Sequence, residues 1–226
     1  MKTKIPKITM NQMHFMKSIK QKEIVEANDV MVEIQPYMFP PKSPFSYSTR
    51  VLLDNIDVAG KRILEIGIGC GIISIVAAKQ GAFVDGVDIL PECVKFSIDN
   101  AVRNKVFDRI RFYYSNMFSR VEGKYDCIIC NLPILNGDLP SNDSRWYSLF
   151  DPDFNFHKCL FLNGKKYASH ILIAHADLDR NCSFGKLESL AEEYGWNVES
   201  YAETKYANHL WRAYQFKLKE VKDVTI

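Results

Sequence analysis

A glycine-rich turn between two apolar segments is the first place in this chain where residue types and spacing could do chemistry. The segment EIGIGCG runs from Glu65 to Gly71, and its glycines stand at positions 67, 69 and 71. Glycine lets the backbone turn sharply and lets a ligand approach without meeting a Cβ atom. The flanking patterns predict a strand before the turn and a helix after it. Such a unit commonly holds a nucleotide-like cofactor at the carboxyl edge of a sheet.

The acids around this turn favour a cationic ligand. The spacing is G-x-G-x-G, whereas dinucleotide-binding turns have G-x-G-x-x-G, and this difference disfavours a nicotinamide-dependent reductase. Glu65 stands two residues before Gly67 and would oppose a pyrophosphate. Asp88 ends the next predicted strand, where a carboxylate can accept bonds from both hydroxyls of a ribose. The alternative is a tight strand-to-helix turn without a ligand.

A second candidate for chemistry is the segment NLPI, Asn131 to Ile134, which follows the apolar run YDCIIC. An amide or exocyclic amine is a poor nucleophile because its lone pair is delocalised. The Asn131 side-chain oxygen and the Leu132 carbonyl could hold the N–H groups of such an acceptor and aim its lone pair. Pro133 restricts Leu132 to extended geometry, which would fix that carbonyl. The alternative is a turn that only ends the strand.

Strand-like and helix-like segments alternate from residue 49 onward, so right-handed crossovers should build a mainly parallel sheet. The last two strands are joined too briefly for a crossover and should pair antiparallel. We therefore predict an α/β, Rossmann-like, doubly wound sheet of seven strands that brings the glycine turn, Asp88 and NLPI to one edge. The predicted strands are 61–67, 83–89, 110–116, 125–131, 169–177, 196–202 and 210–219, and the predicted helices are 49–56, 72–80, 91–104 and 184–195.

We predict that residues 1–36 form an N-terminal helical extension or lid and that residues 37–226 form the main domain. Apolar residues from Met10 to Ile19 recur at helical spacing, which predicts either a helix packed on the domain or a lid that recognises a substrate. A strand is expected at 29–35. Residues 37–45 contain three prolines and should form a loop. In and after that loop, Phe45 or Tyr47 could face a cationic ligand, and Ser48 or Thr49 could hydrogen-bond to it.

Composition narrows the class of protein. The 29 basic and 27 acidic residues nearly cancel, which provides no overall attraction to nucleic acid or to an anionic membrane. No apolar run approaches the ~20 residues of a membrane span, and the N-terminus does not resemble a signal peptide, so we expect a cytoplasmic protein. The six cysteines should stay reduced. The CxxC at Cys127 and Cys130 should be packing, and we expect no metal site. The oligomeric state stays open.

The glycine turn together with Asp88 resembles motif one and the ribose-binding acid of class I methyltransferases that use S-adenosylmethionine. The resemblance covers roughly residues 37–218. It implies that Glu65 lies near the methionine end of the cofactor, that Gly67, Gly69 and Gly71 surround it, and that Asp88 with Ile89 binds its ribose. The segment SNMF falls after the third strand, which implies contact of Asn116 and Met117 with adenine.

The segment NLPI resembles the [N/D]-P-P-[Y/F] motif of the nitrogen-methylating members, among them the release-factor glutamine methyltransferases. Leu132 and Ile134 depart from that motif, and the ring that stacks on a flat acceptor is missing. The resemblance implies catalytic roles for Asn131, Leu132 and Pro133, with Asn131 also beside the cofactor. Four residues are predicted to bind the acceptor: Tyr47, Ile134, Trp146 and Tyr147.

The sequence therefore predicts an S-adenosylmethionine-dependent methyltransferase acting on a nitrogen of a small molecule, peptide or protein side chain. The alternatives are a methyltransferase of RNA or DNA bases, which the lack of a basic module disfavours, and a non-catalytic cofactor-binding member of the fold. Only about 36 residues precede the core, which favours a small acceptor over a release factor. In the polar insert 136–156, three acids could bind a basic substrate, and His175 is a weaker catalytic candidate. These acids are Asp138, Asp151 and Asp153.

Overall fold

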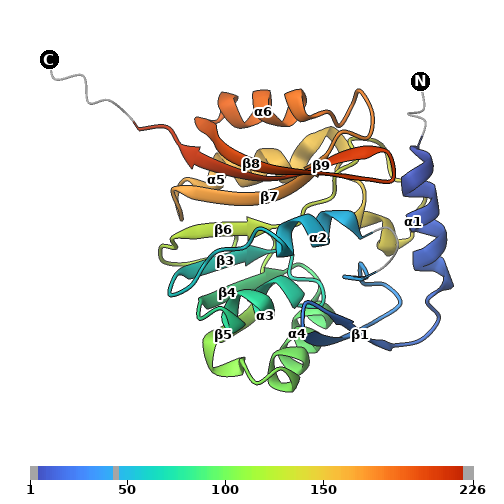
Figure 1. Ribbon diagram of the computed structural model, residues 1–226, viewed down its shortest axis with the longest axis vertical. Helices are drawn as coiled ribbons and strands as arrows, with labels where there is room; N and C mark the ends of the chain where they lie inside the picture. Colours follow the sequence, from blue (N-terminus) through green and yellow to red (C-terminus); the bar gives the residue numbers. More distant parts are fainter. Residues whose placement is uncertain (1–4, 43–45, 221–226) are drawn as a thin grey trace, which may run out of the picture.

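The computed structural model describes residues 5–42 and 46–220 of the chain. A seven-stranded sheet forms its centre. Figure 1 shows α2 (Tyr47–Leu53) and α3 (Ile72–Lys79) in front of this sheet and α5 (Asn155–Gly164) behind it. Helices on both faces bury the apolar strands between them, and this arrangement confirms the predicted α/β class.

The seven strands run in the order β5-β4-β3-β6-β7-β9-β8 across the sheet. Neighbours from β5 to β7 pair parallel, whereas β9 pairs antiparallel with both β7 and β8. All seven predicted strands are present, and the short β8–β9 connection produces the predicted antiparallel pair. Their bounds are β3 (Arg62–Ile66), β4 (Phe83–Asp88), β5 (Ile110–Tyr114), β6 (Cys127–Cys130), β7 (His170–Ala176), β8 (Trp196–Tyr206) and β9 (His209–Leu218).

The helix α5 is absent from the sequence-based assignment, which passes from the insert 136–156 directly to the next strand. Parallel β6 and β7 need a crossover connection, and α5 provides it. Its buried residues stand at helical spacing: His157, Leu160, Phe161 and Gly164. The predicted helices α2, α3, α4 (Pro91–Arg103) and α6 (Phe184–Glu193) are present, and Pro91 begins α4 where its missing N–H costs no hydrogen bond.

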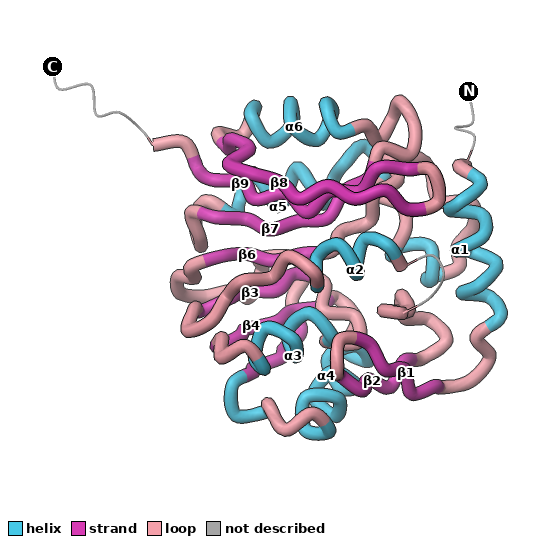
Figure 2. The backbone as a smooth tube through the Cα atoms, in the orientation of Figure 1, coloured by secondary structure: helices cyan, strands magenta, loops and turns pink. Residues whose placement is uncertain are grey.

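The N-terminal residues form a helix, α1 (Lys7–Ser18), and a hairpin of β1 (Glu23–Ala27) and β2 (Val30–Ile34). The helix and the strand at 29–35 match the prediction, whereas β1 was not predicted. Two asparagine side chains, one in α4 and one directly after it, take the place of a neighbouring strand for β2. Asn100 bonds both the N–H and the carbonyl of Glu33, at 2.7 and 3.0 Å, and Asn104 does the same for Met31, at 3.1 and 2.7 Å. Figure 2 shows the hairpin beside α4, apart from the main sheet.

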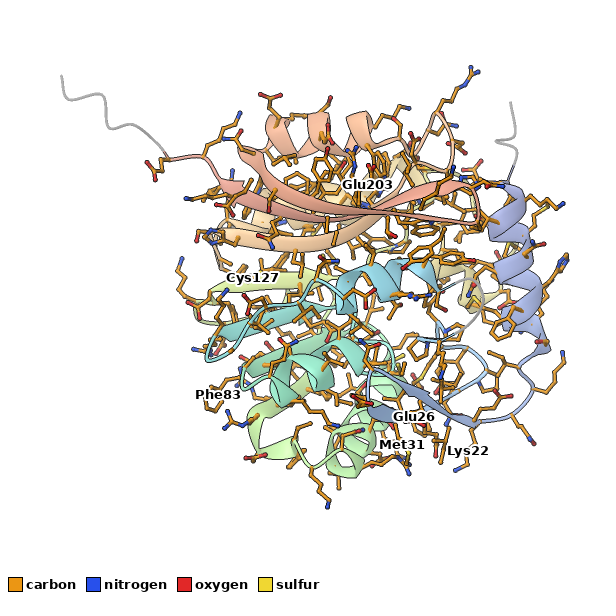
Figure 3. The ribbon with its side chains drawn as sticks, in the orientation of Figure 1. Lys22, Glu26, Met31, Phe83, Cys127 and Glu203 are labelled. Carbon is orange, nitrogen blue, oxygen red and sulfur yellow. The ribbon has the colours of Figure 1, made fainter. Side chains whose placement is uncertain are left out.

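The carboxyl ends of the parallel strands point toward α1. Figure 3 labels Phe83, which begins β4, and Cys127, which begins β6, at the side of the molecule opposite α1. The segments that follow β3, β4, β5 and β6 therefore meet at one edge of the sheet, and α1 runs across that edge (Figure 1).

The cysteines are all free thiols. Cys130 is buried, and its burial raises the pKa of the thiol well above its usual value, so it stays protonated. Within residues 5–42 and 46–220, no helix combines the length and the apolar character that crossing a bilayer requires.

Candidate active site

A cavity of about 500 Å³ opens at the carboxyl edge of the sheet. This volume lies in the range of pockets that bind small molecules, about 300–1,000 Å³. The turns after β3, β4, β5 and β6 line it, together with α1, the start of α2 and parts of the insert 136–156. The four strand ends that the sequence analysis selected therefore share one cavity.

The three glycines of the turn after β3 all have positive φ, at +78° for Gly67, +54° for Gly69 and +81° for Gly71. Side chains rarely adopt this region, so glycine suits each position. Gly67 and Gly69 line the cavity, and a Cβ atom added to either would meet no atom within 4 Å. A Cβ at Gly71 would lie 3.1 Å from Ser97 and 3.2 Å from Phe112. The first two glycines leave room for a ligand, and the third allows close packing.

Glu65 is a buried acid in the wall of this cavity. Its Oε2 accepts bonds from the backbone N–H of Ser74, at 2.8 Å, and from the Ser74 hydroxyl. The pKa of Glu65 is raised to about 8, and loss of hydration on burial is the largest cause of this rise. The nearby charge of Asp88 also raises it. Both bonds go to Oε2, so Oε1 is the oxygen available to a ligand. A buried carboxyl group of this kind suits a cationic partner.

Asp88 ends β4 and lines the same cavity. Its two oxygens accept bonds from the backbone N–H groups of Gly69, at 3.0 Å, and Leu90, at 2.9 Å, and burial raises the pKa of its carboxyl group. A carboxylate has further lone pairs for ribose hydroxyls. Ile89 follows it at the rim, with half of its side chain exposed. Asn116 and Met117, which follow β5, also line the cavity.

The turn after β6 places Asn131, Leu132, Pro133 and Ile134 in the cavity wall. The Asn131 side-chain nitrogen donates a 3.1 Å hydrogen bond to the hydroxyl of Thr49 on α2. Because the nitrogen is held there, the side-chain oxygen is the end of the amide left for an acceptor. Ser48 and Thr49, which sequence analysis named as possible contacts of a cationic ligand, both line the cavity, and Thr49 also makes this bond to the asparagine.

The four residues predicted to bind the acceptor separate into two groups. Ile134 and Tyr147 line the cavity, and the Tyr147 side chain is 55% exposed. Trp146 is 1% exposed, lies outside the cavity lining, and donates from Nε1 to Ser141 at 3.0 Å. Tyr47 also lies outside the lining and stacks on Tyr206, with ring centroids 4.9 Å apart. Trp146 and Tyr47 therefore pack against other parts of the protein and do not face the cavity. Phe45 lies outside the described residues.

The other candidates from the insert and β7 are also accounted for. His175 is fully buried, its Nε2 lies 3.0 Å from the Cys182 carbonyl oxygen, and burial lowers its pKa to about 3. It does not line the cavity. Asp151 is also fully buried and bonds His157 Nδ1 at 2.6 Å, so it is not available to a basic substrate. Asp138 and Asp153 are exposed.

Sequence reasoning named no cavity residue on α1, yet Ile8, Thr9 and Gln12 all line the cavity. These residues lie on one helix face because Gln12 stands three residues after Thr9 and four residues after Ile8. Thr9 and Gln12 are buried polar residues. The only sign of them in the sequence was their position beside apolar residues at helical spacing. The folded chain is needed to show that this face of α1 meets the cavity.

Comparisons with known proteins agree with this architecture. A family model described as "Methyltransferase small domain" matches residues 30–150, more than half of the 226-residue chain. A "Putative protein N5-glutamine methyltransferase" of Methanocaldococcus jannaschii is 40% identical over 113 residues, which cover 50% of this chain and 55% of that protein. A ribosomal protein L11 methyltransferase of Enterobacter sp. (strain 638) is 41% identical over 88 residues, or 38% of this chain and 29% of that protein.

The chain thus spans at most about half the length of these two relatives. A solved structure described as "a putative methyltransferase complexed with SAH" has a TM-score of 0.66 at 14% identity, covering 88% of this chain and 56% of that one. At this identity the likeness concerns the fold. The family match rests instead on the segment from β2 to the insert, which contains the glycine turn, Asp88 and the NLPI turn, and this chain belongs to the methyltransferase small domain family.

Proposed function

We propose that this protein transfers a methyl group from S-adenosylmethionine to the nitrogen of a side-chain amide in a polypeptide. One observation carries the proposal: a single cavity contains the glycine turn, the two acids Glu65 and Asp88, and the Asn131 turn. This arrangement supports a cofactor site that would adjoin a site for a nitrogen acceptor.

The residues present fit this cofactor. Gly67 and Gly69 leave open space, Asp88 retains lone pairs for ribose hydroxyls, and Oε1 of Glu65 is available to the cationic methionine portion. Asn116 and Met117 would contact the adenine, the asparagine through its carbonyl oxygen. When bound, S-adenosylmethionine supplies an electrophilic methyl group attached to a positively charged sulfur.

The residues after β6 would orient the acceptor. The Asn131 side-chain oxygen and the Leu132 carbonyl would accept bonds from the two N–H groups of an amide. Thr49 keeps the Asn131 amide in the required orientation, and Pro133 restricts Leu132. S-adenosylmethionine held by Glu65 and Asp88 would supply the methyl carbon and keep the electrons of its carbon–sulfur bond on sulfur, and the acceptor nitrogen held at the Asn131 turn would give up a proton on accepting that carbon. Orientation of an acceptor in line with that bond supplies much of the rate gain in such reactions.

The acceptor class rests on the Asn131 turn and on relatives whose names specify protein glutamine and ribosomal protein L11. A small-molecule amide or amine is the second candidate, since the cavity volume suits a small ligand. A nucleic acid acceptor is not favoured, because no lysine or arginine is among the described residues that line the cavity.

Calorimetry and a methyl-label assay test the proposal. The full chain should bind S-adenosylmethionine and not NADH, and it should transfer labelled methyl groups to glutamine-containing peptides. Replacing Asn131 with Ala should leave the affinity for the cofactor nearly intact and abolish transfer. Turnover that does not change in Asn131→Ala would reject the role of the NLPI turn. Binding without transfer to any acceptor would favour a non-catalytic member of the fold.

A further inference from the structure

The three tryptophans of the chain differ in the hydrogen bonding of their indole N–H groups. All three residues are buried, with Trp146 1%, Trp196 0% and Trp211 5% exposed. Trp146 donates from Nε1 to the Ser141 hydroxyl at 3.0 Å, and Trp196 donates from Nε1 to the Phe161 carbonyl oxygen at 2.8 Å. The Nε1 of Trp211 has no hydrogen-bond partner among the described residues. The fold thus provides an acceptor for two of the three indole donors.

The unsatisfied donor belongs to a side chain in the cavity wall. Trp211 lines the cavity, whereas Trp146 and Trp196 lie outside its lining. A buried tryptophan N–H usually has a partner, because a donor that has lost its water without gaining an acceptor is unfavourable. A molecule bound in the cavity can supply the missing acceptor atom. Because an indole N–H can only donate, the ligand group must carry a lone pair, as a carbonyl oxygen does.

The position of Trp211 in the sheet indicates which ligand it can reach. Trp211 pairs with Ala176, the last residue of β7, and therefore stands at the carboxyl edge of the sheet. Figure 1 shows the β8–β9 turn on the side of the sheet where α1 lies. In the strand order, β6 lies midway between β4 and β9, two strand spacings or about 10 Å from each. Asp88 ends β4 and Asn131 follows β6, so Trp211 lies beyond the Asn131 turn, on the acceptor side of the cavity.

The short helix α2 contacts both Trp211 and Asn131. Tyr47, its first residue, packs against Trp211, with ring centroids 5.3 Å apart and ring planes tilted by 48°. Thr49, two residues further along, accepts the hydrogen bond from Asn131. One element therefore supports the indole and the asparagine amide together. Such support is what recognition of two groups of one molecule requires.

We propose that Trp211 recognises the acceptor polypeptide, and that its Nε1–H donates to a backbone carbonyl oxygen beside the side chain that is methylated. The amide of that side chain would lie at the Asn131 turn. The backbone of the same residue is several bonds away from its amide, which suits a donor whose strand lies about 10 Å from β6. This inference rests on the proposed function and adds a contact that a small amide without a peptide backbone could not make. Trp211 lies outside the family match at residues 30–150.

Nuclear magnetic resonance observes the donor directly. With ¹⁵N in the indole rings, the full chain should give one N–H peak for each of its three tryptophans, and Trp211→Phe identifies the peak of Trp211 by removing it. The protein is saturated with S-adenosylhomocysteine and then receives a glutamine peptide, or butanamide, which matches the glutamine side chain but has no backbone. We expect the peptide to move the Trp211 proton downfield and butanamide to leave it in place. The peaks of Trp146 and Trp196 should stay in place with both.

Kinetics with a matched tryptophan variant provide a second measurement. Trp211→Phe should lower kcat/KM for the glutamine peptide about tenfold and leave that for butanamide within about twofold. Trp196→Phe makes the same change in the core and should leave both values within about twofold. Trp196→Phe should also lower Tm more than Trp211→Phe does, because it leaves the Phe161 carbonyl without its donor. Equal losses of kcat/KM for the two acceptors would show an effect of ring size and contradict the bond.

The outcomes separate this inference from the proposed function. Methyl transfer to the peptide with a fixed Trp211 peak would overturn the contact and leave the methyltransferase standing. A peak that moves with S-adenosylhomocysteine alone, or equally with butanamide, would assign the donor to the cofactor or to the side-chain amide and overturn the backbone contact. A peak that moves as expected, without transfer to either acceptor, would overturn the proposed function alone. Should Trp211→Phe fail to fold, Trp146→Phe and Trp196→Phe identify the Trp211 peak by elimination.

Discussion

The ionisation of Glu65 should make cofactor binding depend on pH. In the ligand-free cavity burial raises the pKa of Glu65 to about 8, so its carboxyl group is mostly neutral at pH 7. A cationic ligand beside Oε1 favours the carboxylate, so binding should release a proton below pH 8. The affinity should then rise about tenfold for each pH unit well below pH 8, which is about 1.4 kcal/mol per unit, and less steeply as the pH approaches 8. Between pH 6 and pH 8 the gain is about 50-fold, because half of the carboxyl groups are ionised at pH 8.

Isothermal titration calorimetry at pH 6, 7 and 8 measures this effect, and buffers of different ionisation enthalpy count the proton released. Glu65→Gln retains the shape of the side chain and removes its titration, so its affinity should lack this slope. The amino group of the ligand also titrates, but it contributes equally to both proteins. Parallel pH profiles for the two proteins, or binding without proton release at pH 6 to 7, would refute the role of Glu65.

The same carboxyl group should influence the stability of the ligand-free protein. Its pKa is raised from 4.5 in the reference state to about 8 in the folded state, so the folded protein holds the proton over a range in which the unfolded chain has lost it. The stability contributed by this group is complete below about pH 4.5 and is lost as the pH rises through about 8. Thermal unfolding of Glu65→Gln should show a smaller decline over this range, and an identical decline would contradict the pKa.

Three further substitutions test other parts of the site. Thr49→Val removes the acceptor of the Asn131 bond and should lower kcat about tenfold without changing the affinity for the cofactor, with Thr49→Ser as the control that restores the rate. Gly71→Ala places a Cβ at positive φ against tightly packed neighbours and should lower the free energy of unfolding by at least about 1 kcal/mol, measured in urea. His157→Ala removes the ring that bonds the buried Asp151, which keeps only the backbone N–H groups of residues 156 and 157, and should cost about 1–3 kcal/mol, whereas a change below about 1 kcal/mol would show that the side-chain bond contributes little.

Local patterns were sufficient for much of the fold. Seven strands were predicted from short apolar runs that end in glycine or proline. Four of the helices around the sheet were predicted from the helical spacing of apolar residues between those runs. The helix α5 was missed although its buried residues have the same spacing, because the polar, aromatic insert before it was read as a continuous loop. The strand β1 was missed because it lies on the surface and its side chains are mostly exposed, which weakens the alternation that marks a strand.

The sequence by itself determined which chemical groups stand at the carboxyl ends of β3, β4, β5 and β6. The ends of these strands can be located from the alternation of strands and helices and from turn residues, and both signals are local. Only the tertiary structure decided which side chains enter the cavity. Asn131 meets Thr49, which is 82 residues away in the chain, and α1 supplies Thr9 and Gln12, whereas Trp146 turns into the core. The reason is physical: the direction of a side chain depends on how distant elements pack against each other, and no local period encodes that packing.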